Sequence, residues 1–266
     1  FSEFANDLPC QLPGALQDIP KASGAQLHFA ISLCVDLRQH AAKKEVYRDE
    51  ANAIEQALNL ESECHEFVDL GQTDTFAFEE KNFLRRASVA IRASQWDAAR
   101  DILDAHKTSL WTEEGERRLL WRILELGLET LENIKRSEIQ LLHIGSSGKE
   151  LCELYDSELI KVDRAYRELE EATAQTLEGY EEIEAIVEAT RKSYRAHFNL
   201  LQSKFLPVVQ REGWPLNEMK ANVASYDEHV APALRDGKRV VYFLIDALRL
   251  DLAQDLESNI HDHQVR

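Results

Sequence analysis

Apolar residues recur at intervals of three and four along most of this chain, which is the spacing of one buried face of an α-helix. The pattern begins after Ser23 with Leu27, Ile31 and Cys34, and it predicts a first helix there. A second helix is expected over residues 47–58. The sequence therefore predicts a mainly α fold, a multi-helix bundle or scaffold.

Proline and glycine mark the parts that interrupt this pattern, because proline lacks an amide donor and glycine frees the backbone. Pro9, Pro13 and Pro20 fall in the first twenty residues, and the next proline is Pro207. We expect an irregular arm at the start, followed by a long region that is free to be helical. A strong helix is predicted from about residue 113 to 142, and Gly-Ser-Ser-Gly at 145–148 is expected to end it.

Two closely spaced helical segments follow a break at residues 69–78. Phe83, Ala87 and Ile91 mark the first segment, and Trp96 and Ala99 begin the second after a short break at Ser94. The pair resembles a helix-turn-helix unit of the tetratricopeptide type, in which small alanines allow neighbouring helices to approach. Because no second copy follows at a period of about 34 residues, we do not expect a solenoid.

Residues 159–201 carry a coiled-coil-like seam in which spacings of three and four alternate regularly. A single helix over 148–213 would be about 95 Å long at 1.5 Å per residue. Because the seam is weak at Thr173 and Thr176, two helices folded back on each other are an equal alternative. Residues 150–190 hold 13 acidic and 3 basic side chains, which indicates either a solvated helix face or a docking surface for a basic partner.

The pattern changes again after Gly213. A short helix is expected over 226–234, and residues 239–246, Arg-Val-Val-Tyr-Phe-Leu-Ile-Asp, then form a β-branched and aromatic run. Such a run predicts a strand covered on both faces, as at the centre of a parallel sheet, followed by a helix over 247–256. The predicted domains are thus a helical scaffold at 1–237 and the truncated start of an α/β domain at 238–266, within a longer protein.

Charge and cysteine usage narrow the function classes. The chain has 31 Lys and Arg against 48 Asp and Glu, a formal net charge of −17, which disfavours binding to a nucleic-acid backbone. The four cysteines show no metal-ligand spacing and are expected to be free thiols, so we expect a cytoplasmic location. The longest apolar run, 240–245, is much shorter than the roughly 20 residues of a membrane helix, so no membrane contact is expected.

One residue stands out as candidate chemistry. Asp246 ends the predicted strand, where open α/β sheets place their ligands, and its carboxylate is suited to bind a metal ion. The alternative is that Asp246 caps the helix expected to begin at the next residue. Weaker candidates are the 261–263 group His-Asp-His, read as a polar tail, and His28 and His197, read as core histidines.

Several short motifs, in this order, resemble the PglZ family of BREX phage-defence systems. They are Phe-Ser-Glu-Phe at 1–4, Asp-Leu-Pro at 7–9, Asp-Thr-Phe at 74–76, Phe-Glu-Glu at 78–80, Gly-Trp at 213–214, Val-Ala-Pro-Ala-Leu at 230–234 and Phe-Leu-Ile-Asp-Ala-Leu-Arg at 243–249. The family carries an alkaline-phosphatase-superfamily domain, whose first metal ligand is an aspartate at the end of the first strand. Asp246 matches that position.

The resemblance implies that the longer protein is a metal-dependent phosphoester hydrolase, a phosphatase or a nuclease, with divalent ions, zinc by family expectation. The nucleophile and the other ligands would follow Arg266, so this chain alone is expected neither to hold the metal nor to catalyse. Its expected partners are other phage-defence proteins. The alternative is a stand-alone helical interaction module without catalysis.

Overall fold

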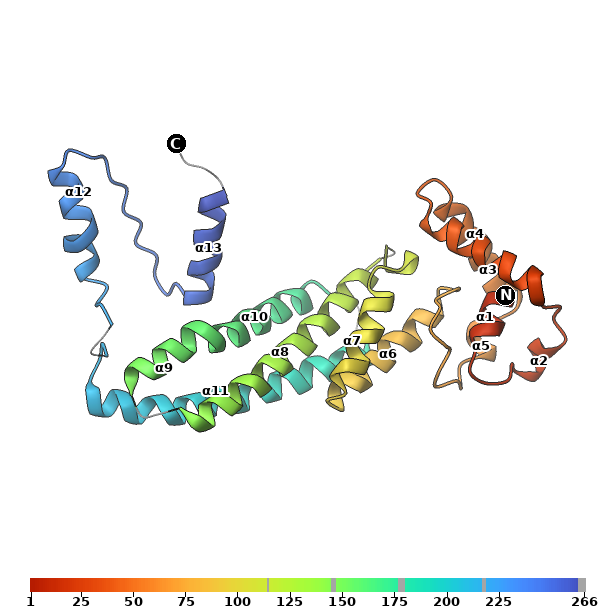
Figure 1. The fold of residues 1–266 in the computed structure, drawn as a ribbon, viewed down its shortest axis with the longest axis horizontal. Helices are drawn as coiled ribbons and strands as arrows, with labels where there is room; N and C mark the ends of the chain where they lie inside the picture. Colours follow the sequence, from red (N-terminus) through yellow and green to blue (C-terminus); the bar gives the residue numbers. More distant parts are fainter. Residues whose placement is uncertain (114, 145–146, 177–179, 217–218, 263–266) are drawn as a thin grey trace. The chain divides into compact units, whose positions relative to one another are not determined.

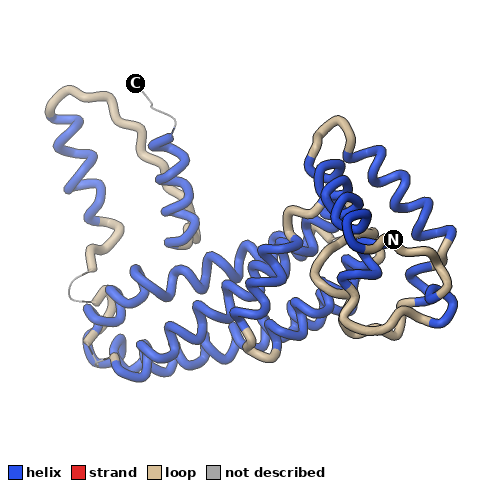
Figure 2. The backbone as a smooth tube through the Cα atoms, turned by 45° about the vertical axis from the view of Figure 1, so that its right-hand side comes forward, coloured by secondary structure: helices blue, strands red, loops and turns tan. Residues whose placement is uncertain are grey.

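The computed structural model describes residues 1–113, 115–144, 147–176, 180–216 and 219–262 of the protein. These residues form helices joined by loops and turns, with no strand among them (Figures 1 and 2), so the prediction of a mainly α fold is confirmed. The helices in chain order are α1 (Ser2–Asp7), α2 (Gly14–Gln17), α3 (Gly24–Gln39), α4 (Lys44–Ala57), α5 (Leu60–Glu63), α6 (Glu79–Arg92), α7 (Trp96–His106), α8 (Arg117–His143), α9 (Gly148–Leu154), α10 (Ile160–Ala174), α11 (Glu181–Glu212), α12 (Ala231–Arg235) and α13 (Leu250–Asp262).

Contacts within the chain define two compact units. The first comprises Phe1–Leu128 and Leu169–Ala189, and the second comprises Glu129–Glu168 and Thr190–Arg266. The predicted division between residues 237 and 238 is not a boundary of these units, since both residues lie in the second. That division stays a prediction about the longer protein.

The N-terminal arm is part of the core of the first unit, and the expectation that it is irregular is wrong. Pro9 and Pro13 lie between α1 and α2 and do not interrupt either helix, because proline is tolerated at and before a helix start. Phe4 and Leu16, from these two helices, are almost fully buried. They belong to a cluster with Leu8, Leu12, Tyr47, Ala51, Leu60, Cys64, Leu70, Phe76, Phe78, Leu110 and Trp111.

The two helices predicted on either side of Ser94 form a hairpin. α6 and α7 pack closely along their length, and Ala87 and Ala99 are fully buried between neighbours. The chain reverses at Ser94, whose φ of 58° lies in the left-handed region. The helical hairpin is therefore confirmed, and it fixes the start of α6, where several acidic side chains enter the core.

The seam in the second half folds back on itself. α10 ends at Ala174 and α11 begins at Glu181, so the single continuous helix is wrong and the two-helix alternative is confirmed. In the second unit the Tyr166 and Tyr194 rings stack at 3.7 Å between centroids, which places α10 beside α11. Thr173 occupies a seam position where a long coiled coil would place an apolar residue. Its hydroxyl donates to the Leu169 carbonyl one turn earlier.

Substitution of Phe4 tests whether the arm belongs to the core. Phe4→Ala removes a fully buried ring from α1 and is expected to cost about 3–5 kcal/mol of unfolding free energy. Phe29→Ala is the matched control because Phe29, on α3, is 70% exposed, and we expect a change below about 0.5 kcal/mol. Urea unfolding followed by circular dichroism measures both. Equal, small losses would show that the arm does not pack as described.

Glu79, the first residue of α6, is a buried carboxyl in this core. One carboxylate oxygen accepts the Phe76 amide at 2.6 Å, and the other has no hydrogen-bond partner among the described residues. Burial raises the pKa of Glu79 well above its usual range, opposed by the Phe76 amide and supported by the nearby charge of Asp74. The folded protein therefore keeps this proton at pH values where the unfolded chain has released it.

This difference gives a pH dependence of stability with a defined sign. Where the folded protein binds more protons than the unfolded chain, the free energy of unfolding falls as pH rises. The contribution of Glu79 is thus complete below its unfolded pKa and is lost progressively as the pH rises from that value through the raised pKa of the folded state. Glu79→Gln removes this loss, so its stability relative to wild type should be greater at pH 8 than at pH 5 in urea unfolding. Exposed Glu66→Gln is the control, and an equal difference at both pH values would contradict the prediction.

Candidate functional site

Asp246 lies in the connection between α12 and α13, in the second unit. The strand expected over 239–246 is not formed, and this segment carries exposed apolar side chains, with Phe243 78% and Leu244 84% exposed. The reason is physical: a strand is stabilised by hydrogen bonds to a neighbouring strand, and the described residues contain none. Residues 239–246 thus have the composition of an interior strand but have no neighbouring strand among the described residues.

The helix after Asp246 also begins later than expected. α13 starts at Leu250, whereas the sequence predicted a start at Ala247. Asp246 and Ala247 instead form a turn in which Ala247 has a φ of 53°, in the left-handed region that non-glycine residues seldom adopt. α13 begins four positions after Asp246, so Asp246 does not cap a helix that starts at Ala247, as the capping alternative required.

The described residues do not assemble a metal site. Within them, no group of three or more His, Cys, Asp or Glu side chains is placed so that it could hold a metal ion. Zinc sites use at least three protein ligands, and Asp246 supplies one carboxylate. The 261–263 group cannot be placed, because His263 lies outside the described residues. The assignment of Asp246 as a metal ligand therefore stays a prediction for the longer protein.

The two histidines expected in the core differ from each other. His28 is exposed on α3, so that expectation is wrong for it. His197 on α11 is 3% exposed, and its Nδ1 has no partner among the described residues. Burial lowers the pKa of His197, which favours a neutral core histidine. The connector expected between two helices near residue 145 agrees with α8 ending at His143 and α9 beginning at Gly148, although Gly145 and Ser146 lie outside the described residues.

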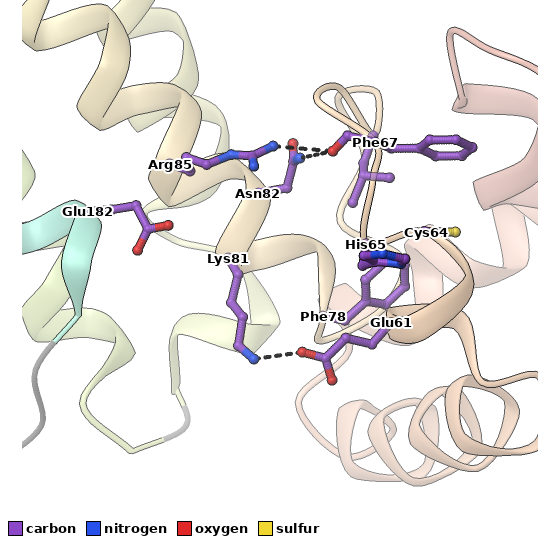
Figure 3. Close-up of a pocket in the computed structure, with 10 residues that line it drawn as sticks. Glu61, Cys64, His65, Phe67, Phe78, Lys81, Asn82, Arg85 and Glu182 are labelled. Atoms are coloured by element: carbon purple, nitrogen blue, oxygen red, sulfur yellow. Dashed lines mark hydrogen bonds and ion pairs between the residues drawn. The ribbon is translucent and has the colours of Figure 1, made fainter.

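A hollow of about 200 Å³ lies in the first unit beside α6 (Figure 3). Cys64 is one of its lining residues, and Lys81 and Glu61, which also line it, form an ion pair of 2.6 Å. On the opposite side, Asn82 and Arg85 donate to the Phe67 carbonyl at 3.1 and 3.2 Å (Figure 3). Because burial raises the pKa of Cys64 to about 11, this residue is a thiol at neutral pH and not a nucleophile. These polar groups thus bind parts of the protein itself.

A polar cluster around Asp163 in the second unit was not predicted from the sequence. The carboxylate of Asp163, on α10, accepts the hydroxyls of Tyr155 and Tyr194 at 2.6 and 2.7 Å. The guanidinium of Arg249 lies 3.8 Å from the same carboxylate. Burial, followed by the Asp163 contact, raises the pKa of both tyrosines. The two phenols therefore stay protonated and donate to Asp163.

A second set of ion pairs adjoins this cluster. Arg167 on α10 binds Asp251 at 2.8 Å and Asp255 at 2.6 Å, and Arg249 binds Asp251 at 3.0 Å. The side chain of Asp251 is fully buried. Burial alone would raise the pKa of Asp251, but Arg167 and Arg249 outweigh it and the pKa is lowered. Asp251 is thus an ionised, paired carboxylate.

Comparison with known proteins supports a PglZ-like relationship. The alkaline phosphatase-like protein PglZ of Bacillus cereus (strain H3081.97) is 22% identical to this chain over 242 residues. The match covers 87% of the chain but 28% of the relative, so the chain spans little more than a quarter of that protein's length. No protein-family model matches the chain, and no solved structure matches it. Among the described residues, no helix has the length and apolar character needed to cross a membrane.

Hydrogen exchange tests whether the apolar segment before Asp246 lacks a sheet. In a chain of residues 1–266, amides 240–245 are expected to exchange rapidly, because their side chains are exposed and no ladder protects the backbone. Amides in α8, which carries the buried residues Leu120, Ile123 and Leu124, should exchange slowly. Strong protection of 240–245 in a monomer would show that the segment packs within the chain.

Proposed function

We propose that this chain is the helical region of a PglZ-like protein and that the longer protein is a metal-dependent phosphoester hydrolase. The carrying observation is the match to PglZ, which extends over 87% of the chain but 28% of the relative. The expected catalytic domain would then belong to the part of the relative that this chain does not span.

The segment around Asp246 supports this proposal independently of the match. Residues 240–245 have the composition of a buried strand, yet Val241, Phe243 and Leu244 are exposed. Exposed apolar runs of this kind are unfavourable unless another surface covers them. The sheet of a phosphatase-like domain would cover the run and would place Asp246 at the end of its first strand.

The described residues supply only a fraction of the metal site. A divalent ion, zinc by family expectation, would lower the pKa of a bound water or polarise a phosphoryl oxygen. Asp246 offers one oxygen ligand, and the described residues add no cluster that could complete the site. The remaining ligands and the nucleophile are therefore assigned to the longer protein, where phosphatase and nuclease reactions are both open.

We further propose a cytoplasmic location, as expected from the free cysteines. We also propose a role in a phage-defence system, with other proteins of that system as partners of the helices, as the family resemblance implies. The net charge of −17 supports protein partners over nucleic acid for this region. The acidic run at 150–190 favours a second candidate, a helical interaction module that binds a basic partner without any link to catalysis.

An activity assay separates these two candidates. The chain of residues 1–266 should not hydrolyse an aryl phosphate with added Zn²⁺ or Mg²⁺, because one carboxylate cannot form the site. The longer protein should hydrolyse a phosphoester in a metal-dependent manner, and Asp246→Asn should reduce its rate by at least about a hundredfold.

Asp236→Asn, in the connection before the apolar segment, is the matched control and should retain activity. A longer protein that is folded but inactive with both metals on phosphomonoesters and phosphodiesters would favour the interaction module. Turnover by residues 1–266 that disappears in Asp246→Asn would also contradict the assignment, because it would mean that the chain completes a site by itself.

A further inference from the structure

Within the second unit, α13 contacts α10 through its polar face. Asp251, on that face, is fully buried, whereas Leu252, Leu256 and Ile260 are 36%, 41% and 53% exposed. These three apolar residues are spaced by four and lie on one side of the helix. A surface helix normally turns such a stripe toward the core, so the orientation of α13 is the reverse of the usual one.

Charged hydrogen bonds, and not apolar burial, hold this orientation. Arg167 binds two aspartates one helical turn apart, Asp251 at 2.8 Å and Asp255 at 2.6 Å. Arg164, one turn earlier on α10, donates to Gln254 at 2.9 Å. Charge-assisted bonds of this kind are among the strongest in proteins and set geometry as well as energy. The spacing on α10 thus matches the spacing on α13.

The α10 side of this contact is organised by its own neighbours. Asp163 is held by two tyrosine hydroxyls, from Tyr155 and Tyr194, and it lies 3.8 Å from Arg249. Tyr194 lies on α11, so α10 and α11 both contribute side chains to this cluster. We call the face formed by Asp163, Arg164 and Arg167 the α10 seat.

We propose that the α10 seat is the surface through which the helical region binds the phosphatase-like domain, with the polar face of α13 as its partner. α13 would then serve two layers: its aspartates bind the scaffold, and its leucines pack on the sheet of that domain. This inference rests on the proposed function for the identity of the second layer. The charge pairing on α10 does not depend on it.

Continuity along the chain favours the sheet of the phosphatase-like domain as the occupant of the apolar face of α13. The exposed apolar segment 240–245 immediately precedes α13, and a strand followed by a helix requires a sheet on which both can pack. The chain spans 28% of its PglZ relative, which leaves ample length for such a sheet in the longer protein. A second copy of this chain is the competing occupant.

Hydrogen exchange of α13 in the 1–266 chain tests the seat. Arg167→Ala should accelerate exchange of amides 252–260 by at least about tenfold, because it removes the ion pairs that join α10 to Asp251 and Asp255 and leaves the buried Asp251 with Arg249 as its remaining ion-pair partner. Arg195→Ala, at an exposed arginine on α11, is the control and should leave α13 unchanged. Exchange in α8 reports whether the bundle stays folded. Unchanged exchange of α13 in Arg167→Ala, with the bundle intact, would overturn the proposal.

Substitutions on the opposite face of α13 provide the second arm. Leu252→Gln with Leu256→Gln should change exchange of α13 by less than about threefold, since the apolar face does not hold the helix in this chain. Loss of α13 protection in this double variant would overturn the seat. Restored protection on combining Arg167→Asp with Asp251→Arg would support it.

A concentration series identifies what covers the apolar face. Exchange of α13 that does not vary with protein concentration, in a monomer by light scattering, supports the sheet of the longer protein as the occupant. Slower exchange in a concentration-dependent dimer would assign the face to a second copy and overturn that part of the proposal. No step of these measurements uses hydrolysis, so an inactive longer protein would contradict the proposed function and leave the seat standing.

Discussion

A β-strand requires a neighbour for its backbone N–H and C=O groups, and this constraint governs the last part of the described chain. Residues 240–245 have side chains suited to the interior of a sheet, but no strand is present to pair with them. The segment is therefore irregular, Asp246 sits in a turn, and α13 starts at Leu250. The apolar side chains that a sheet would cover are left in solvent.

Ion pairs, and not buried apolar side chains, position α13. The ion pairs of Arg167 with the fully buried Asp251 and with Asp255 hold α13 against α10. Taking ionised groups out of water is costly unless they are paired, so such a pair stabilises one geometry more than it stabilises the fold. The first unit uses the same device in its core, where Arg38 binds Glu3 through two bonds of 2.7 Å. Buried acids thus fix specific contacts in both units.

Most of the helices could be predicted from the sequence, because helical periodicity is a property of neighbouring residues. The hairpin of α6 and α7 and the end of α8 could be predicted from spacing and glycine alone. The helices of the N-terminal arm were not predicted, because prolines are expected to interrupt helices. Here Pro9 and Pro13 lie between α1 and α2 and leave both helices intact. The signal that could have corrected this is the spacing of Phe4, Leu8, Leu12 and Leu16, which recur every four residues.

The polar cluster could not be predicted in the same way. Asp163 and Arg249 are far apart in sequence, and their pairing depends on how α10, α11 and α13 are placed. A local signal is the pair of aspartates at 251 and 255, one turn apart, which form ion pairs with Arg164 and Arg167 on α10. Many surface helices carry two acidic residues one turn apart with little effect on stability, so this spacing alone does not identify a contact.

Asp246 and Asp251 differ in how far the described residues account for the role of each. Asp251 is buried, ionised and held by two arginines, so its role is complete within the described residues. Asp246 is exposed in a turn, and the described residues contain no group of three or more His, Cys, Asp or Glu side chains that could hold a metal ion. A carboxylate becomes a metal ligand only when other ligands converge on the same point. In the proposed hydrolase, the helical region would fix where the catalytic domain attaches, and the chemistry would depend on ligands that the rest of that protein brings to Asp246.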